Sequence, residues 1–274
     1  MDISRISGAI FGAAAADAAG STFEGLMPDE NRIPTMQGGG QFSLAKGEVT
    51  DDTLMTLALL ETYAETKTFS RERFLSKMAV TIRNHPKTFG NTTKTLASLV
   101  EQGCFPKSAA KAVDLIFGSR TNGSVMRTLP VGLTAHSAEE AVAEGRRVSA
   151  FTHLDLEAQD ACAAVSSAVY ALLHGAAKDE VLENIPAKYL EGELYPSVDA
   201  LESTRCVFCI FRDAETYVDA VTKACRLGGD TDTIAAIAGG MCGALYGIEA
   251  VPKEWCEALN VKEQLELAIK KIWG

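Results

Sequence analysis

The feature that most constrains the fold is a stripe of small residues near the start of the chain. Within an apolar run, a small residue occupies every fourth position, at Gly8, Gly12, Ala16 and Gly20. Residues four apart lie on one face of an α-helix, so this spacing gives a smooth face that another helix can approach closely. A second run of small apolar residues, Thr233 to Leu245, is the natural partner. We expect these two helices to approach each other beside a cleft.

Helical spacing of apolar residues continues through most of the chain. Further helices are predicted at Thr53 to Leu60, Ser70 to Arg83, Ser137 to Val148, Leu156 to Leu173, Ala214 to Leu227 and Val261 to Ile272. Alternation typical of strands is absent, except that Cys206 to Phe211 fits either a strand or a buried helical turn. No Pro- or Ser-rich linker divides the chain. The sequence therefore predicts an all-α fold, with residues 1–274 forming one domain.

Composition excludes several classes of protein. The 274 residues are 47% hydrophobic and 23% charged, which is typical of a folded chain with a large core. No apolar stretch reaches the ~20 residues of a membrane span, so we expect no membrane association. The net charge of −10, without a basic stripe, argues against long nucleic acid as a partner. A monomer is the default expectation.

The run from Gly8 to Ala19 resembles the core of a signal peptide, but its charges differ. Asp2 cancels Arg5 in the leader, and Asp17 interrupts the apolar centre. We interpret the run as a buried first helix and predict a cytoplasmic protein.

The seven cysteines are an odd number, and most of them occupy apolar periodic runs. They are interpreted as reduced core residues. Cys206 and Cys209 have the spacing of a redox pair or of half a zinc site, but a second ligand pair is missing. Burial in the core is the favoured interpretation.

Two acidic clusters, Gly47 to Thr53 and Gly228 to Thr233, each begin an apolar helix. Ordinary N-capping explains either cluster alone. Two such clusters together favour a metal site, and their oxygen donors suit Mg²⁺ or Mn²⁺ better than zinc. Ile234 excludes an EF-hand, because it occupies a ligand position of that loop. The four histidines lack the spacing of a zinc site.

Other segments have the character of ligand loops. Gly118 to Ser124 is rich in residues whose backbone N–H groups can face an anion, and it precedes a predicted helix start at Val125. A solvated turn is the alternative. Phe89 to Thr93 and the pair Thr152 and His153 also precede helical segments. Glu24 follows the first helix, where the dipole disfavours a carboxylate, so it is either a surface residue or lies beside a cation.

These motifs, in this order, resemble the ADP-ribosylglycohydrolase family, which includes the dinitrogenase-reductase-activating glycohydrolases. The resemblance runs from about Ile6 to Gly247 and is carried by Thr-Asp-Asp-Thr, Asn-Gly-x-x-Met-Arg and Gly-Gly-Asp-Thr-Asp-Thr. It implies a compact single-domain orthogonal bundle of helices with two divalent cations, Mg²⁺ or Mn²⁺. The implied activity is hydrolysis at C1″ of ADP-ribose attached to an acceptor.

The resemblance also implies roles for individual residues. The implied metal ligands are Thr50, Asp51, Asp52, Asp230, Asp232 and Thr233. The implied catalytic carboxylates are Glu24, Asp51 and Asp232. The implied contacts to ADP-ribose are Gly90, Asn91, Gly118, Ser119, Asn122, Gly123 and His153. The chain departs from the family where relatives often have Gly-Asn-Gly, since Thr121 stands at the first of these positions, and Arg120 stands where an aromatic residue is common.

Arginine on an ADP-ribosylated protein is the expected acceptor. Serine, a nucleobase and an O-acetyl ester are the alternatives within the same chemistry. Two further hypotheses are a non-catalytic structural relative and a two-metal hydrolase acting on phosphoesters. A structural relative is free to lose metal ligands, whereas all six positions are filled here.

Overall fold

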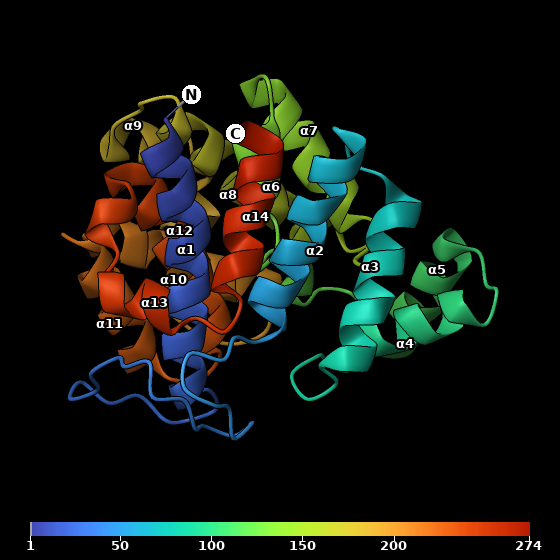
Figure 1. The fold of residues 1–274 in the computed structure, drawn as a ribbon, viewed down its shortest axis with the longest axis horizontal. Coiled ribbons are helices and arrows are strands. Elements are labelled where there is room, and N and C mark those ends of the chain that lie inside the picture. Colours follow the sequence, from blue (N-terminus) through green and yellow to red (C-terminus); the bar gives the residue numbers. More distant parts are fainter. Residues whose placement is uncertain (1) are drawn as a thin grey trace.

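The computed structural model describes residues 2–274, and the regular secondary structure of this part of the chain is helical (Figure 1). The helices are α1 (Ile3–Gly20), α2 (Asp51–Thr66), α3 (Arg71–Asn84), α4 (Asn91–Glu101), α5 (Pro106–Phe117), α6 (Leu129–Thr134), α7 (Ala138–Ser149), α8 (Leu156–Leu173), α9 (Lys178–Glu183), α10 (Ala200–Asp213), α11 (Tyr217–Leu227), α12 (Thr231–Tyr246), α13 (Lys253–Ala258) and α14 (Lys262–Trp273). Short 3₁₀ turns are η1 (Ser21–Phe23), η2 (Asn122–Ser124), η3 (Ala187–Tyr189) and η4 (Ile248–Ala250). Between residues 2 and 274 there is no strand, only two isolated bridges. The prediction of an all-α single-domain fold is confirmed.

Most predicted helices lie where apolar periodicity placed them. The segment Cys206 to Phe211, left open between strand and helix, is part of α10. The prediction of a helix start at Val125 is wrong. Residues 122–127 form consecutive turns, and α6 begins at Leu129. A helix starting at Val125 would need a backbone N–H from Pro130, which has none, whereas Pro is tolerated in the first turn of α6.

The central contact joins α1 to α12, as the small residues predict. The two helices are antiparallel, and the contact is so close that side chains cannot fit between their backbones. A Cβ atom placed on Gly243 would lie 1.9 Å from the carbonyl oxygen of Gly8, and one on Gly20 would lie 2.6 Å from that of Thr231. This packing brings the C-terminal end of α1 against the N-terminal end of α12.

The remaining predictions about the core are mostly confirmed. Residues of α1 from Gly8 to Gly20 are all buried, so the signal-peptide-like run is an interior helix. Cys206 and Cys209 are free and buried in α10. Cys104 is exposed and Cys256 half-buried, in contrast to the other cysteines. Among the described helices, none combines the length and hydropathy that crossing a bilayer requires.

Candidate functional site

The two acidic clusters meet at one cavity of about 260 Å³. Thr50 caps α2, Asp230 stands at the start of α12, and Glu24 follows η1 at the end of α1. The cavity is lined by five carboxylates from these three segments, Glu24, Asp51, Asp52, Asp230 and Asp232. The close packing of α1 on α12 is what brings Glu24 to the start of α12.

Asp17 holds the start of α2 in place, and sequence reasoning missed this role. Its carboxylate is fully buried in α1 and accepts hydrogen bonds from the backbone N–H and the hydroxyl of Thr50, with the hydroxyl at 2.8 Å. It also accepts from the backbone N–H of Thr53 at 3.2 Å and from the Thr53 hydroxyl. Asp17 thereby fixes the helix turn that carries Asp51 and Asp52. The available signal was a lone carboxylate within an otherwise apolar helix.

The second cluster is positioned by Asn122 and by the backbone. The side-chain amide of Asn122 donates to Asp230 at 2.5 Å. One carboxylate oxygen each from Glu24, Asp230 and Asp232 lie within 4.8 Å of one another, a spacing that a single cation could span. The hydroxyl of Thr231 donates to the carbonyl of Gly20, which ties α12 to α1.

The charges of these carboxylates oppose one another. Burial, followed by the charges of Asp17 and Glu24, raises the pKa of Asp51 to about 8. Burial also raises the pKa values of Asp52 and Asp232 well above their usual range. The charge of Asp17 adds to the rise at Asp52, and the charge of Asp52 adds to the rise at Asp232. Crowded, buried carboxyl groups are typical of functional sites and of cation binding.

The donor set fits a hard divalent cation. Oxygen Oδ1 of Asp52 and oxygen Oε2 of Glu24 are buried, and neither has a hydrogen-bond partner among the described residues. Unpartnered buried carboxylate oxygens are costly, and a cation would satisfy them.

One side of the cavity is lined by His153, whose imidazole is neutral. His153 is fully buried, and burial, followed by the charge of Arg127, lowers its pKa to about 3. Its imidazole contacts the hydroxyls of Thr121 and Thr152. The absence of a side chain at Gly123 leaves room for the ring, because a Cβ there would lie 3.2 Å from Nε2.

The structure brings together most, though not all, of the predicted site residues. Those that line the cavity are Glu24, Asp51, Asp52, Gly90, Asn91, Asn122, Gly123, His153, Asp230, Asp232 and Thr233. Thr50, Gly118 and Ser119 are not in the lining. The hydroxyl of Ser119 instead accepts from the backbone N–H groups of Leu154 and Asp155, and Gly118 is exposed after α5.

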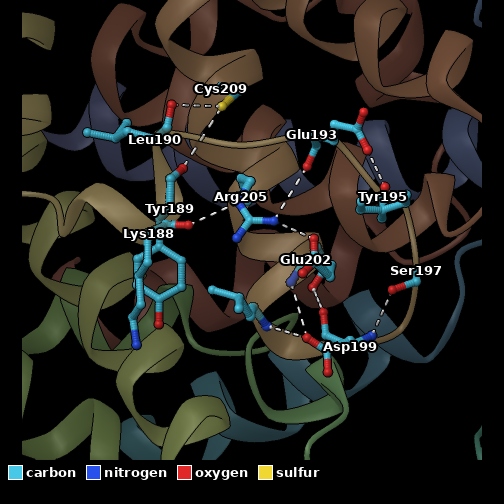
Figure 2. A network of polar contacts seen from close by, with 12 residues as sticks. Lys188, Tyr189, Leu190, Glu193, Tyr195, Ser197, Asp199, Glu202, Arg205 and Cys209 are labelled. Atoms are coloured by element: carbon cyan, nitrogen blue, oxygen red, sulfur yellow. Dashed lines mark hydrogen bonds and ion pairs between the residues drawn. The ribbon is translucent and has the colours of Figure 1, made fainter.

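A polar network fixes the segment beside the cavity that precedes α10 (Figure 2). Arg205 of α10 donates to the carbonyl oxygens of Lys188 at 3.0 Å and Glu193 at 3.4 Å. Asp199 caps α10 through the backbone N–H of Leu201 at 2.9 Å. The backbone carbonyl of Val198, which also lines the cavity, accepts from the backbone N–H of Asn122 at 2.8 Å. The network therefore supports the loop that carries Asn122.

Comparisons with curated proteins, solved structures and family models all find similarity to ADP-ribosylglycohydrolases. The chain is 29% identical to the "ADP-ribosylarginine hydrolase Tri1" of Pseudomonas putida, over 99% of this chain and 78% of that protein. It is 26% identical to the "ADP-ribosyl-(dinitrogen reductase) glycohydrolase" of Rhodospirillum rubrum, over 96% of this chain and 92% of that protein. A solved structure titled "ADP-ribosylglycohydrolase-related protein complex" superposes with a TM-score of 0.86 at 25% identity, covering 99% of this chain and 97% of that one. The family model described as ADP-ribosylglycohydrolase matches residues 2–274. The chain therefore belongs to the ADP-ribosylglycohydrolase family of hydrolases, which act on ADP-ribosylated substrates.

Proposed function

We propose that this chain removes ADP-ribose from ADP-ribosylated protein by hydrolysing the bond between C1″ and an arginine side-chain nitrogen. The observation that carries the proposal is the convergence of five carboxylates on one cavity whose lining also includes Asn91, Thr92 and Thr121, side chains that can donate to an anion. The arginine linkage is supported by the name of one relative, the ADP-ribosylarginine hydrolase, and a protein acceptor is supported by the name of another, the dinitrogen reductase glycohydrolase.

We assign the cavity two divalent cations, Mg²⁺ or Mn²⁺. Their ligands would be Thr50, Asp51, Asp52, Asp230, Asp232 and Thr233. The unpartnered Oδ1 of Asp52 supports this assignment. When bound, the cations would supply positive charge and a template for ribose hydroxyls.

The protein's own carboxylates would manage the water and its proton. Water attacks C1″ as the bond to the acceptor nitrogen breaks. One water proton passes to a carboxylate, and the carboxylate then gives this proton to the leaving nitrogen, so that ADP-ribose and a free arginine side chain are formed. We assign this task to Glu24, Asp51 and Asp232. A carboxylate with a raised pKa is a better base near neutral pH, and burial raises the pKa of Glu24. Negative charge beside C1″ also stabilises an oxocarbenium-like transition state. The proposed contacts to ADP-ribose are Gly90, Asn91, Gly118, Ser119, Asn122, Gly123 and His153.

The test is a panel of ADP-ribosylated substrates linked through arginine, serine, a nucleobase or an O-acetyl ester. The chelated protein, and the same protein with Mg²⁺ or Mn²⁺ restored, are assayed for release of free ADP-ribose. We expect release from the arginine substrate only with cation, and at least a hundredfold loss in Asp232→Asn. Glu191→Gln, which changes an exposed carboxylate outside the cavity lining, is the matched control.

The outcomes separate the parts of the proposal. Release from another linkage only would contradict the arginine acceptor and retain the reaction class. Formation of a mononucleotide would indicate phosphoester hydrolysis instead. Full activity in EDTA would contradict the role of the cations.

A further inference from the structure

A series of hydrogen bonds leads from the buried side chain of Arg127 to the cavity. Nη2 of Arg127, which is fully buried, donates to the hydroxyl of Thr152 at 2.7 Å. That hydroxyl is 2.7 Å from Nδ1 of His153. On the other side of the ring, Nε2 is 3.0 Å from the hydroxyl of Thr121, which lines the cavity.

The guanidinium group of Arg127 sets the direction of each hydrogen bond in this series. A guanidinium group has donors only, so the Thr152 oxygen accepts from it. The single hydroxyl proton of Thr152 must then be donated to Nδ1, because its hydroxyl, which is buried, has no other partner within residues 2–274. His153 is neutral, since its pKa is lowered by burial, and a neutral ring that accepts at Nδ1 carries its proton on Nε2. Nε2–H therefore donates to Thr121.

The Thr121 hydroxyl is left with its own proton free to donate into the cavity. Thr121 makes no other side-chain hydrogen bond within residues 2–274. The environment favours an anionic acceptor there, because Arg127 has no carboxylate within ion-pair distance in the described chain and lies over the ring of Phe74 at 5.3 Å. Arg127 therefore has no salt-bridge partner behind the relay, and the charge of Asp51 acts on it only at longer range.

We propose that Arg127, Thr152 and His153 form a positioning relay that orients the hydroxyl of Thr121 as a hydrogen-bond donor to the diphosphate of bound ADP-ribose. This inference rests on the proposed function for the identity of the ligand. It assigns Thr121 a contact that a glycine at this position would have no side chain to make. Thr121 is the ligand contact, and Arg127 acts through the other two residues.

The direction of the relay is measured without any ligand. His85, His136 and His174 are exposed, so a His85→Gln, His136→Gln, His174→Gln protein retains His153 as its single histidine. In two-bond ¹H–¹⁵N spectra of this protein, we expect one tautomer, protonated at Nε2, from pH 5 to 8. Arg127→Met should release the Thr152 hydroxyl to accept from Nδ1–H, and a second tautomer should appear. A single-histidine protein that carries its proton on Nδ1, or a folded Arg127→Met protein with an unchanged spectrum, would overturn the relay.

Binding tests the contact itself. Thr121→Val keeps the shape of the side chain and removes the donor, and Thr121→Ser keeps the donor. Calorimetric titration with ADP-ribose should show about ten- to hundredfold weaker binding for Thr121→Val, the usual effect of losing one hydrogen bond to a charged group, and near-normal binding for Thr121→Ser. ADP should lose affinity by the same factor, because it shares the diphosphate.

The two proposals fail in distinguishable ways. Failure of the unmodified chain to bind ADP-ribose would contradict the proposed function, and with it the ligand assigned to Thr121, while the spectra would still decide the direction of the relay. Normal ADP-ribose binding by Thr121→Val would overturn the contact and leave the proposed function intact. A loss for ADP-ribose that spares ADP would overturn the assignment to the diphosphate. If Arg127→Met does not fold, the spectrum of the single-histidine protein and the Thr121 pair decide the matter.

Discussion

Removal of divalent cations should make the stability of the folded chain depend steeply on pH. The pKa of Asp51 is raised from 3.8 to about 8, first by burial and then by the charges of Asp17 and Glu24. Between pH 5 and 8 the folded state therefore keeps a proton that the unfolded state has released, so the free energy of unfolding falls as pH rises. For Asp51 alone the fall over this range is about 4 kcal/mol, from the 1.4 kcal/mol that corresponds to about one pKa unit. Asp52 and Asp232 are shifted in the same direction and add to it.

A bound cation should oppose this trend, because it binds the ionised carboxylates and competes with the protons. A cation at a hundred times its Kd stabilises the folded state by about 2.7 kcal/mol. The measurement is urea unfolding followed by circular dichroism at pH 5, 6, 7 and 8, in EDTA and in Mn²⁺. The gain from Mn²⁺ should grow with pH. Asp51→Asn should lessen the pH dependence in EDTA, and the exposed-site variant Glu191→Gln should leave it unchanged.

A flat free energy of unfolding from pH 5 to 8 in EDTA would refute the reasoning, since it would mean that the buried carboxylates titrate normally. An equal gain from Mn²⁺ at pH 5 and pH 8 would also refute it. Such a cation would bind somewhere other than the carboxylates whose pKa values are raised.

Three further predictions concern the framework of the site. Asp17→Asn should lower the free energy of unfolding by about 2–4 kcal/mol, because the buried acceptor of four hydrogen bonds is altered. The same variant should bind Mn²⁺ more weakly in a calorimetric titration. Unchanged Mn²⁺ affinity would show that Asp17 does not position α2 for cations. Gly243→Ala should cost about 1–3 kcal/mol or more in urea unfolding, because its Cβ would overlap the backbone of Gly8, and unaltered stability would contradict the close packing of α1 on α12. Of the thiols, Cys104 should react quickly with a disulfide reagent and Cys256 slowly, with the buried five reacting only after unfolding; a rapid reaction of Cys206 or Cys209 would instead indicate an accessible pair.

The parts of the fold that were predictable are those in which local pattern and tertiary packing agree. The four-residue stripe from Gly8 to Gly20 and the small residues of α12 predicted a close helix pair, and both helices are buried along that contact. Periodicity also located α8. The error at Val125 arose because a polar, glycine-containing segment followed by apolar residues is compatible with a helix start or with consecutive turns, and Pro130 decided between them.

For the site, the sequence identified the chemistry of the carboxylates but not the groups that hold them. Glu24, Asp51 and Asp232 are recognisable because a carboxylate at a helix end is conspicuous. Asp17 and Arg127 are interior residues, and their partners are distant in the sequence or reached through a hydroxyl. No local pattern indicates that Asp17 contacts Thr50, because that contact exists only once α1 and α2 have packed together.

The framework explains why the clustered charges do not separate. The N-termini of α2 and α12 each contribute a partial positive charge, about half a unit per helix, to the five carboxylates of the cavity. This sum neutralises only a minor part of the negative charge, so the remainder must be balanced by protons or by cations. A loosely packed fold would relieve the repulsion by moving the helix ends apart. Here the backbones of α1 and α12 are already in contact along Gly8 and Gly243, and Asp17 ties α2 to α1, so the carboxylates stay together. The raised pKa values and the affinity for divalent cations are therefore two consequences of one constraint, and a substitution that loosens the α1–α12 contact should diminish both.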